Sequence, residues 1–413
     1  MLVYSRVLGE AAPEAFVLSA GDPTVADLMK LINGARSAQG RVLELDVDGT
    51  DDTPLAAVGI TDGDLVEVRA VGEPKFDTTP SPRPSLDLDA VSPPVANGRR
   101  LNEYEEVTQL LQWHGPYHID GGRPSQKVWT DDSTELRCSD WESYRTPDKL
   151  YYRTYTTRQA RAGRSVATAF EFAQRDGQLA AVDPSRVELL RKVIGVLQYP
   201  DWGLCVAHQN ATRFALSSWI AGATSFMMFD QLRHAQLYGR LAIAYGEHFD
   251  GFEDPRPDWM EEPRFQSCRR LIEETLTNLD WGKTIVLADL IVEPLLTSAA
   301  HALLTTGSLA AGDGLTPFVC RSIEDDKLRH RESAAAFLRL VCSDDAFGRA
   351  NRDLVETWVS AVLPQAHAAA AQLLGEFDVE SALTETMAWI TAQFAESGID
   401  LASIQLKETE VTA

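Results

Sequence analysis

Two segments of the sequence repeat one five-residue frame, in which an aspartate precedes an Arg-His pair. The first frame, DQLRH, runs from Asp230 to His234, and the second, DKLRH, runs from Asp326 to His330. In an α-helix, residues three and four positions apart lie on one face, so the polar side chains of each frame leave the helix on the same side. The repeat therefore favours a bundle in which two helices turn matching polar faces toward a shared interior.

An acidic residue lies about one helical hairpin before each frame. Asp201 precedes His234, and Glu293 precedes Lys327, by almost the same interval along the chain. Either interval suits two long antiparallel helices joined by a tight turn, because an α-helix rises by about 1.5 Å per residue. We therefore expect each acid to meet its frame near the middle of the bundle.

The position three residues before each histidine decides what such a bundle can hold. In carboxylate-bridged di-iron helices this position is an acid, but here it is Gln231 in the first frame and Lys327 in the second. A lysine ammonium repels a metal cation and has no lone pair unless it is deprotonated. The sequence therefore predicts a mainly α, ferritin-like bundle whose metal site is disabled. The vestigial ligand positions are Asp201, Gln231, His234, Glu293, Lys327 and His330.

A simpler interpretation of the frames remains open. Each could be an ordinary Asp–His pair four residues apart on one helix, buried and hydrogen-bonded. Two frames with matching upstream acids favour the disabled metal site. On either interpretation we assign no catalytic residue and no metal ligand to this chain.

Composition excludes several classes of protein. The formal net charge of −23 argues against a nucleic-acid partner, because binding to phosphates requires a basic surface. The five cysteines are scattered, without a CxxC pair, which suits reduced thiols in the cytoplasm. The first residues lack the pattern of a secretory signal. The longest apolar stretch, residues 214–229, is interrupted by Ser and Thr and is too short for a bilayer, so we expect no membrane span.

Residues 1–72 form a separate block. Alternating patterns predict strands over 2–8, 14–18, 42–47 and 65–71, and residues 22–34 carry a helix start, an apolar face and a closing glycine. This ββαββ order resembles a ubiquitin-like β-grasp domain. The block holds twelve acidic and five basic residues and lacks the paired-glycine tail of conjugated ubiquitin-like proteins. We therefore interpret it as a docking module.

Two irregular segments follow this module. Residues 73–100 contain six of the twenty prolines and are expected to form an extended linker. Residues 101–147 are rich in aromatic side chains but have no sustained period, so we expect an extended arm that wraps across another surface, a partner subunit in preference to its own bundle. The candidates for a subunit interface are Tyr104, Trp113, Tyr117, Trp129, Trp141 and Tyr144.

Residues 148–413 carry the helical pattern. Apolar residues recur at three- and four-residue spacing over 148–177, 184–199, 202–248, 263–280, 281–307, 315–343, 347–374 and 379–394. The breaks between these segments fall at Gly, Pro or Asp. This region is the predicted ferritin-like domain.

Six separate motifs resemble those of one protein family. They are NEYEEVT (102–108), DWESYRTPDKL (140–150), YRTY (152–155), DWGK (280–283), LIVEP (290–294) and WVSAVLP (358–364). In this order, over about residues 99–375, the sequence resembles the β-subunit of the toluene, phenol and methane monooxygenase hydroxylases. Residues 1–72 resemble the ubiquitin-like γ-subunit of the toluene-oxidising branch, here fused ahead of β.

The resemblance implies a function and a set of partners. It implies a structural, non-catalytic β/γ subunit of a bacterial multicomponent hydroxylase that performs O2-dependent hydroxylation or epoxidation of aromatic or alkene substrates. The two irons are expected in a partner α-subunit, and NADH is expected to act through a ferredoxin or flavin reductase. A small effector protein and a dimer of protomers are also implied.

Two other functions compete with this one. The chain could be a self-sufficient metalloenzyme that uses Asp201, His234, Glu293 and His330 around a reduced metal site. It could also be a non-enzymatic scaffold whose ubiquitin-like head recruits an unrelated partner. A neighbouring gene that encodes two intact ExxH helices would favour the hydroxylase subunit.

Overall fold

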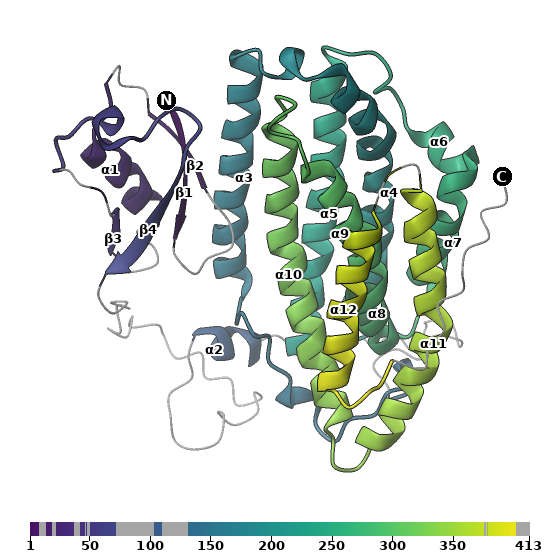
Figure 1. The fold of residues 1–413 in the computed structure, drawn as a ribbon. Helices are drawn as coiled ribbons and strands as arrows, with labels where there is room; N and C mark the ends of the chain where they lie inside the picture. The colour runs from purple at the N-terminus through teal and green to yellow at the C-terminus, as the bar shows by residue number, and fades with distance from the viewer. Residues whose placement is uncertain are drawn as a thin grey trace, which may run out of the picture. The chain divides into compact units, whose positions relative to one another are not determined.

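The computed structural model describes residues 1–7, 14–18, 22–36, 42–45, 47, 50–71, 103–109, 131–375, 377 and 379–401. The chain divides into two compact units. One comprises residues 1–91 and 153–178, and the other comprises residues 92–152 and 179–413. The first unit holds a small sheet domain and helix α3 (Tyr152–Arg175), which begins one residue before the division, and the second holds a helical bundle (Figure 1).

The sheet domain has the predicted ββαββ order. Its elements are β1 (Leu2–Val7), β2 (Glu14–Val17), α1 (Val25–Arg36), β3 (Val42–Leu45), the 3₁₀ turn η2 (Leu55–Val58) and β4 (Leu65–Val71). The sheet order is β2-β1-β4-β3, with β1 and β4 parallel and the other pairs antiparallel. The expected small α+β domain ahead of the bundle is confirmed, while its kinship with ubiquitin stays a prediction.

The inner face of this sheet and helix α1 form one apolar core. Val3, Val66 and Val68 from the strands pack with Leu28 and Ile32 from α1. A reciprocal cap fixes the start of the helix: the Thr24 amide donates to the Asp27 carboxylate at 3.0 Å, and the Asp27 amide donates to the Thr24 hydroxyl at 3.3 Å.

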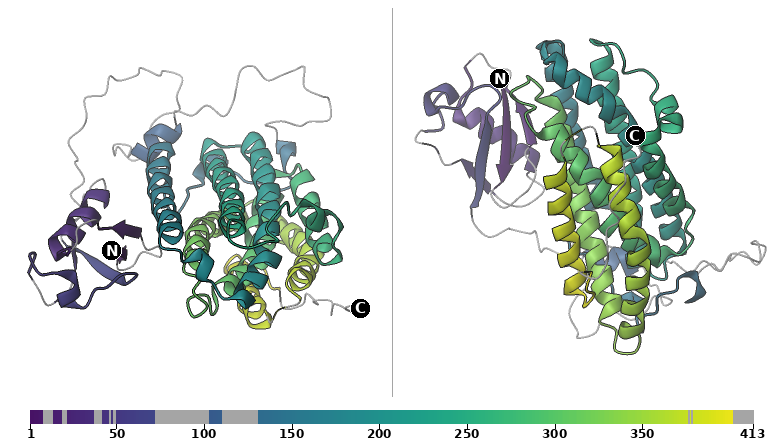
Figure 2. Two further views of the ribbon diagram at one scale, coloured as in Figure 1. Left: turned by 90° about the horizontal axis from the view of Figure 1, so that it is seen from above. Right: turned by 45° about the vertical axis from the view of Figure 1, so that its right-hand side comes forward.

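The bundle is built from long helices that run side by side (Figures 1 and 2). Helices α4 and α5 form one extensive pair, and α10 packs on α5, on α9 and on the π-helical turn η6. Helices α11 and α12 also pack against α9. The elements of the second unit are α2 (Glu103–Gln109), η3 (Asp131–Ser133), η4 (Trp141–Ser143), η5 (Leu179–Ala181), α4 (Pro184–Phe214), α5 (Ser218–Gly246), α6 (Arg256–Glu261), α7 (Pro263–Thr277), α8 (Trp281–Leu287), η6 (Ala288–Val292), α9 (Glu293–Thr305), α10 (Leu315–Cys342), α11 (Gly348–Leu373) and α12 (Glu380–Glu396).

One predicted helix boundary is wrong. The sequence placed a break at 200–201, next to a proline, but Pro200 lies inside α4, which continues to Phe214. A proline removes only one helical hydrogen bond, and packing against neighbouring helices maintains the helix across it. The break comes at residues 215–217 instead, where the Ser217 hydroxyl accepts from the Ile220 amide and caps α5.

One helical stretch, Trp281–Thr305, is long and apolar enough to cross a membrane by length and composition, and 89% of its most apolar window is buried inside the protein. It comprises α8, η6 and α9 in continuous succession. Its apolar character is therefore explained by its position at the centre of the bundle. All five cysteines are free thiols, and four of them are buried.

The end of the aromatic arm packs on this central stretch. The Asp280 carboxylate caps α8 by accepting from the Lys283 amide at 2.8 Å, and it also accepts from the Thr134 hydroxyl and the Glu135 amide, each at 2.7 Å. Gly282 leaves room for the arm, because a Cβ there would lie 2.6 Å from the Thr134 hydroxyl. The sequence DWGK thus joins the arm to the bundle.

The aromatic residues of the arm that the structure describes contact the chain's own helices. Tyr104 packs edge-on against Trp219, with ring centroids 5.0 Å apart, Trp141 packs in the same way on Trp281, and the Tyr144 hydroxyl donates to the Ser333 carbonyl at 3.0 Å. The expected preference for a partner surface is therefore corrected for the buried Tyr104 and Tyr144. Trp113, Tyr117 and Trp129 lie outside the described residues, and a subunit contact of the arm stays a prediction.

Candidate functional site

The six vestigial positions come together in the middle of the bundle. Asp201 lies on α4, the first frame on α5, the second frame on α10, and Glu293 is the first residue of α9, directly after η6. All six side chains are buried. The spacing argument predicted that these residues meet near the middle of the bundle, but the predicted segments left Asp201 in a break at 200–201, whereas it lies inside α4.

Lys327 lies at the centre of this group. Its ammonium nitrogen is 2.8 Å from Asp201 Oδ1 and 3.3 Å from Glu293 Oε1, and it also lies 3.3 Å from Thr297 Oγ1 and 3.5 Å from Gln231 Oε1. Burial by itself lowers the pKa of Lys327, but the charges of Asp201 and Glu293 outweigh this effect and hold the pKa above its usual value. A protonated ammonium therefore occupies the space between the carboxylates.

The two frames are bonded to each other crosswise. His234 Nε2 lies 3.3 Å from Asp326 Oδ2, and His330 Nε2 lies 3.0 Å from Asp230 Oδ2. The alternative of an Asp–His pair within one helix is therefore wrong, since each histidine pairs with the aspartate of the other frame. Burial lowers the pKa of His330 to about 3, and burial also lowers the pKa of His234. Both rings are neutral, and each donates through Nε2.

Arginines neutralise the aspartates of the frames. Arg329 Nη2 lies 2.9 Å from Asp230 Oδ2 and 2.6 Å from Asp326 Oδ1, so it bridges both frames, and Arg233 Nη1 lies 2.8 Å from Asp326 Oδ2. Although burial raises the pKa of Asp326, its hydrogen bond with His234 and the charges of Arg329 and Arg233 bring it well below the usual value. The repeated arginine of the sequence frame thus supplies the counter-charge.

A chain of polar contacts that the sequence did not reveal leads away from the centre. Arg331 binds Glu293 through two contacts, of 2.9 and 3.0 Å, and binds Glu324 at 2.6 Å. His301 Nδ1 lies 3.3 Å from Glu324 Oε2, and His301 Nε2 lies 2.6 Å from the Tyr238 hydroxyl. Despite burial, the charges of Arg331 and Lys327 lower the pKa of Glu293 to about 2. Glu293 is therefore held by two cations.

A second histidine pair was also missed. His208 Nε2 lies 3.0 Å from Asp289 Oδ2, and its Nδ1 lies 2.8 Å from the Leu204 carbonyl. Burial opposes the charged form of His208, but Asp289 and the hydrogen bonds raise its pKa overall. The only sequence signal was the spacing of His208, two helical turns after Asp201 on the same face of α4.

The residues present do not fit a metal. Lys327 places a cation against Asp201 and Glu293, and Arg331 holds both oxygens of Glu293. Within the described ranges, no group of three or more His, Cys, Asp and Glu side chains is arranged to hold a metal ion. Among the described residues of this network, Asp201 Oδ2 and His330 Nδ1 are buried without a hydrogen-bond partner. The arrangement is a network of fixed, mutually compensating charges.

This network predicts a loss of stability in acid. The folded pKa values of His330 and His234 lie below the unfolded value near 6.5, so the stability they contribute is complete above pH 6.5 and declines below it, in the case of His330 down to about pH 3. Each proton taken up only on unfolding contributes a slope of up to about 1.4 kcal/mol per pH unit. His208, with its raised pKa, acts in a different pH range: the stability it contributes is complete below pH 6.5 and is lost as the pH rises above that value.

Urea unfolding at pH 7.5, 6.5 and 5.5 measures this slope. We expect the free energy of unfolding to decrease as the pH falls from 6.5 to 5.5, and His330→Gln to have a shallower dependence over this interval. A His330→Gln chain with the slope of the native chain would contradict the assignment of His330 as a neutral, buried ring.

The sequence of this chain matches a family of known proteins. A family model described as "Methane/Phenol/Alkene Hydroxylase" matches residues 122–345, more than half of the chain. The chain belongs to this family. The resemblance stated from its motifs, to the hydroxylase β-subunits of bacterial multicomponent monooxygenases, is confirmed.

The hydroxylase relatives include β-subunits of two monooxygenases. The methane monooxygenase component A beta chain of Methylosinus trichosporium is 26% identical over 309 residues, which cover 67% of this chain and 74% of the relative. The toluene-4-monooxygenase hydroxylase component subunit beta of Ectopseudomonas mendocina is 24% identical over 289 residues, which cover 67% and 86%.

Solved structures show the same fold. The phenol hydroxylase of Pseudomonas sp. OX1 superposes with a TM-score of 0.67 at 17% identity, covering 74% of this chain and 92% of that chain. The ferritin-like helical fold predicted from the two frames is thereby confirmed.

Proposed function

We propose that this chain is a non-catalytic β-type subunit of a multicomponent hydroxylase, with a γ-like head at its N-terminus. Its role is to support an α-subunit that carries two irons. The relatives act on methane, phenol, toluene and propane according to their names, so an aromatic, alkene or small alkane substrate is proposed for the complex. Electrons from NADH arrive through a reductase, an effector protein regulates the complex, and two protomers form a dimer in the cytoplasm.

The observation that carries the proposal is the position of Lys327. A charged nitrogen 2.8 Å from Asp201 and 3.3 Å from Glu293 occupies the space where a bundle of this kind would bind a cation. With its pKa raised, Lys327 stays protonated at neutral pH. The charge balance that metals supply in an intact site is supplied here by side chains.

The alternative of a self-sufficient metalloenzyme is opposed by the same contacts. Of its four proposed ligands, Asp201 and Glu293 bind Lys327, and His234 and His330 are bound crosswise to aspartates through Nε2. A metal would have to displace the ammonium and leave that charge buried and uncompensated, at a cost of several kcal/mol. The scaffold alternative lacks a supporting observation of this kind.

Metal analysis of the purified chain tests the assignment. We expect well under one iron per chain, because an ammonium and a guanidinium already hold the carboxylates. Two irons per chain with an oxo-bridge absorption band would overturn the proposal.

Copurification tests the partner. When the chain is expressed with its genomic neighbours, we expect it to copurify with a second chain that carries two ExxH helices, and the complex to hydroxylate an aromatic or alkene substrate. Product formed by this chain and a reductase alone would instead favour the metalloenzyme.

A further inference from the structure

A small, partly enclosed cavity lies beside the two frames, between helices α5 and α10. The residues that α10 contributes to its lining are polar, and those that α5 contributes are apolar. They are, respectively, Arg329, His330 and Ser333, and Ala223, Phe226 and Met227. The cavity has room for about one water molecule. It therefore suits only a very small ligand.

Two polar atoms of the residues that line this cavity lack a hydrogen-bond partner. His330 Nδ1 and Arg329 Nε are both buried, and no residue in the described part of the chain bonds to either atom. The other side of each group is already engaged, since His330 Nε2 lies 3.0 Å from Asp230 Oδ2 and Arg329 Nη2 lies 2.9 Å from the same oxygen. A buried polar atom without a partner is costly, so a ligand that bonds to both atoms would be favoured.

The chemistry of the two atoms specifies this ligand. His330 Nε2 faces the Asp230 carboxylate and therefore carries the ring proton, which leaves Nδ1 as a lone-pair acceptor. Arg329 Nε can only donate. The ligand must therefore donate one hydrogen bond and accept another. An anion such as chloride has no proton for Nδ1, and a metal cation is repelled by the guanidinium.

A hydroxyl group meets both requirements, and the size of the cavity restricts it to water. A buried water typically makes about three hydrogen bonds. Ser333, one helical turn after Arg329 and His330 on the same lining, has a hydroxyl that can supply the third. The apolar residues of α5 close the opposite side and have no side-chain group that competes for the water.

We propose that one water molecule binds in this cavity, donating to His330 Nδ1 and accepting from Arg329 Nε. Both of these residues already contact Asp230 of the first frame. The water therefore completes the hydrogen bonding of the crosswise pair on the side that Asp230 does not reach. The proposal is independent of whether the chain is a hydroxylase subunit.

The water would also connect the frames with the end of the arm. Thr146 and Asp148 line the same cavity. The Thr146 hydroxyl lies 3.1 Å from the Tyr104 hydroxyl, and Asp148 Oδ2 lies 3.6 Å from Arg329 Nη1. The site is therefore complete only where this part of the arm is docked on the bundle.

A crystal structure of the full chain that resolves single waters tests the site. We expect one isolated density peak within hydrogen-bond distance, about 2.7–3.2 Å, of both His330 Nδ1 and Arg329 Nε. A bromide soak should give no anomalous peak there, because Nδ1 has no proton to offer an anion. A site without density, a molecule larger than water, or a bromide peak would each overturn the proposal.

Nuclear magnetic resonance of the chain labelled with ¹⁵N-histidine gives an independent test in solution. The signal of His330 is identified among the eight histidines by its loss in His330→Gln. Ala223→Val fills the cavity and should shift the Nδ1 resonance downfield, as expected when a lone pair loses its hydrogen bond. Ala221→Val adds the same volume on the same helix away from the cavity lining and should leave the resonance in place. A resonance that is the same in the native chain and in Ala223→Val would contradict a water bound to Nδ1.

Discussion

Replacing Lys327 by methionine will lower the free energy of unfolding by about 3–5 kcal/mol, as expected when one partner of a buried ion pair is removed. Methionine fills nearly the same volume, so little cavity is created. The loss arises because Asp201 keeps a buried negative charge without its 2.8 Å ammonium partner, and Glu293 keeps only Arg331. Chemical denaturation of the purified variant measures the change.

Two variants show whether charge is the cause. Lys327→Met combined with Asp201→Asn removes both charges of the pair, and we expect it to recover much of the loss, since a matched neutral pair costs little. Lys192→Met removes a partly exposed lysine that lies 3.8 Å from Glu188, and it should change stability by less than about 1 kcal/mol. If the double variant were no more stable than Lys327→Met, lost packing would be the explanation.

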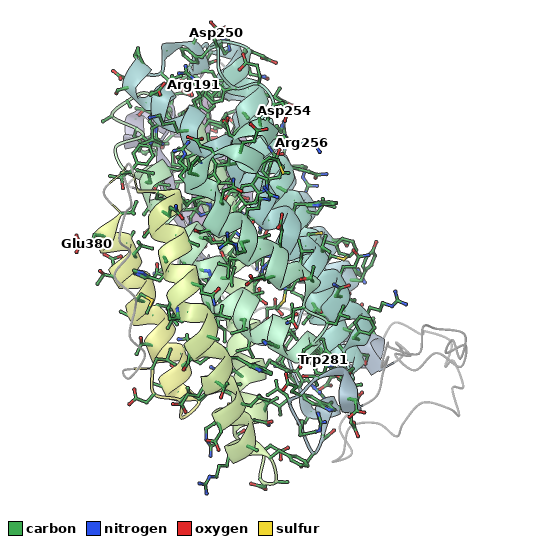
Figure 3. The ribbon with its side chains drawn as sticks, turned by 90° about the vertical axis from the view of Figure 1, so that its right-hand side faces the viewer. Arg191, Asp250, Asp254, Arg256, Trp281 and Glu380 are labelled. Atoms are coloured by element: carbon green, nitrogen blue, oxygen red, sulfur yellow. The ribbon has the colours of Figure 1, made fainter. Side chains whose placement is uncertain are left out.

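Replacing Trp281 by alanine will also lower the free energy of unfolding, by about 3–5 kcal/mol. Trp281 is 1% exposed and lies at the end of the bundle opposite Arg191 and Asp250 (Figure 3). The centroid of its ring lies 5.0 Å from that of Trp141 in the arm and 5.6 Å from that of Phe337 on α10. Its indole nitrogen donates a hydrogen bond to the Ser133 hydroxyl at 2.9 Å. The substitution leaves a cavity and removes one of the two hydrogen-bond partners of the buried Ser133 hydroxyl, which also donates to the Phe214 carbonyl.

Trp202→Ala is the matched control for this prediction. Trp202 lies on α4 and is 55% exposed, so its replacement should change stability by less than about 0.5 kcal/mol. Denaturant unfolding of the isolated chain compares the two variants. Equal, small effects would mean that the arm is not docked on the bundle in the absence of a partner subunit.

The charge network has a consequence for how this chain relates to metal-binding bundles. Four helices bring polar residues to one interior, and such an interior is costly unless the charges are matched. In this chain Lys327, Arg329 and Arg331, close together on α10, supply the positive charge that bound cations supply elsewhere. These three side chains therefore balance the carboxylates of the polar interior.

Periodicity and spacing by themselves determined much of the protein. The repeated frames, with Asp201 and Glu293 about one hairpin upstream, predicted the six residues that meet in the middle of the bundle, because helical geometry converts sequence spacing into a shared face. The strand alternation within residues 1–72 predicted the order of the small sheet domain. These features depend on the spacing of residues along the chain, so the sequence pattern is sufficient to predict them.

Tertiary structure alone decided the pairing of charges and the place of the arm. The sequence could not show that His234 pairs with Asp326 and His330 with Asp230, since a pair within each frame was equally compatible with the spacing. It did not reveal Arg331, His208 or Asp289, whose partners lie on other helices, and it placed a break at Pro200 that packing overrides. An unpaired charge is costly when it is buried, so each buried charge pairs with an opposite charge on a neighbouring helix. Which groups pair therefore depends on how the helices approach one another in space.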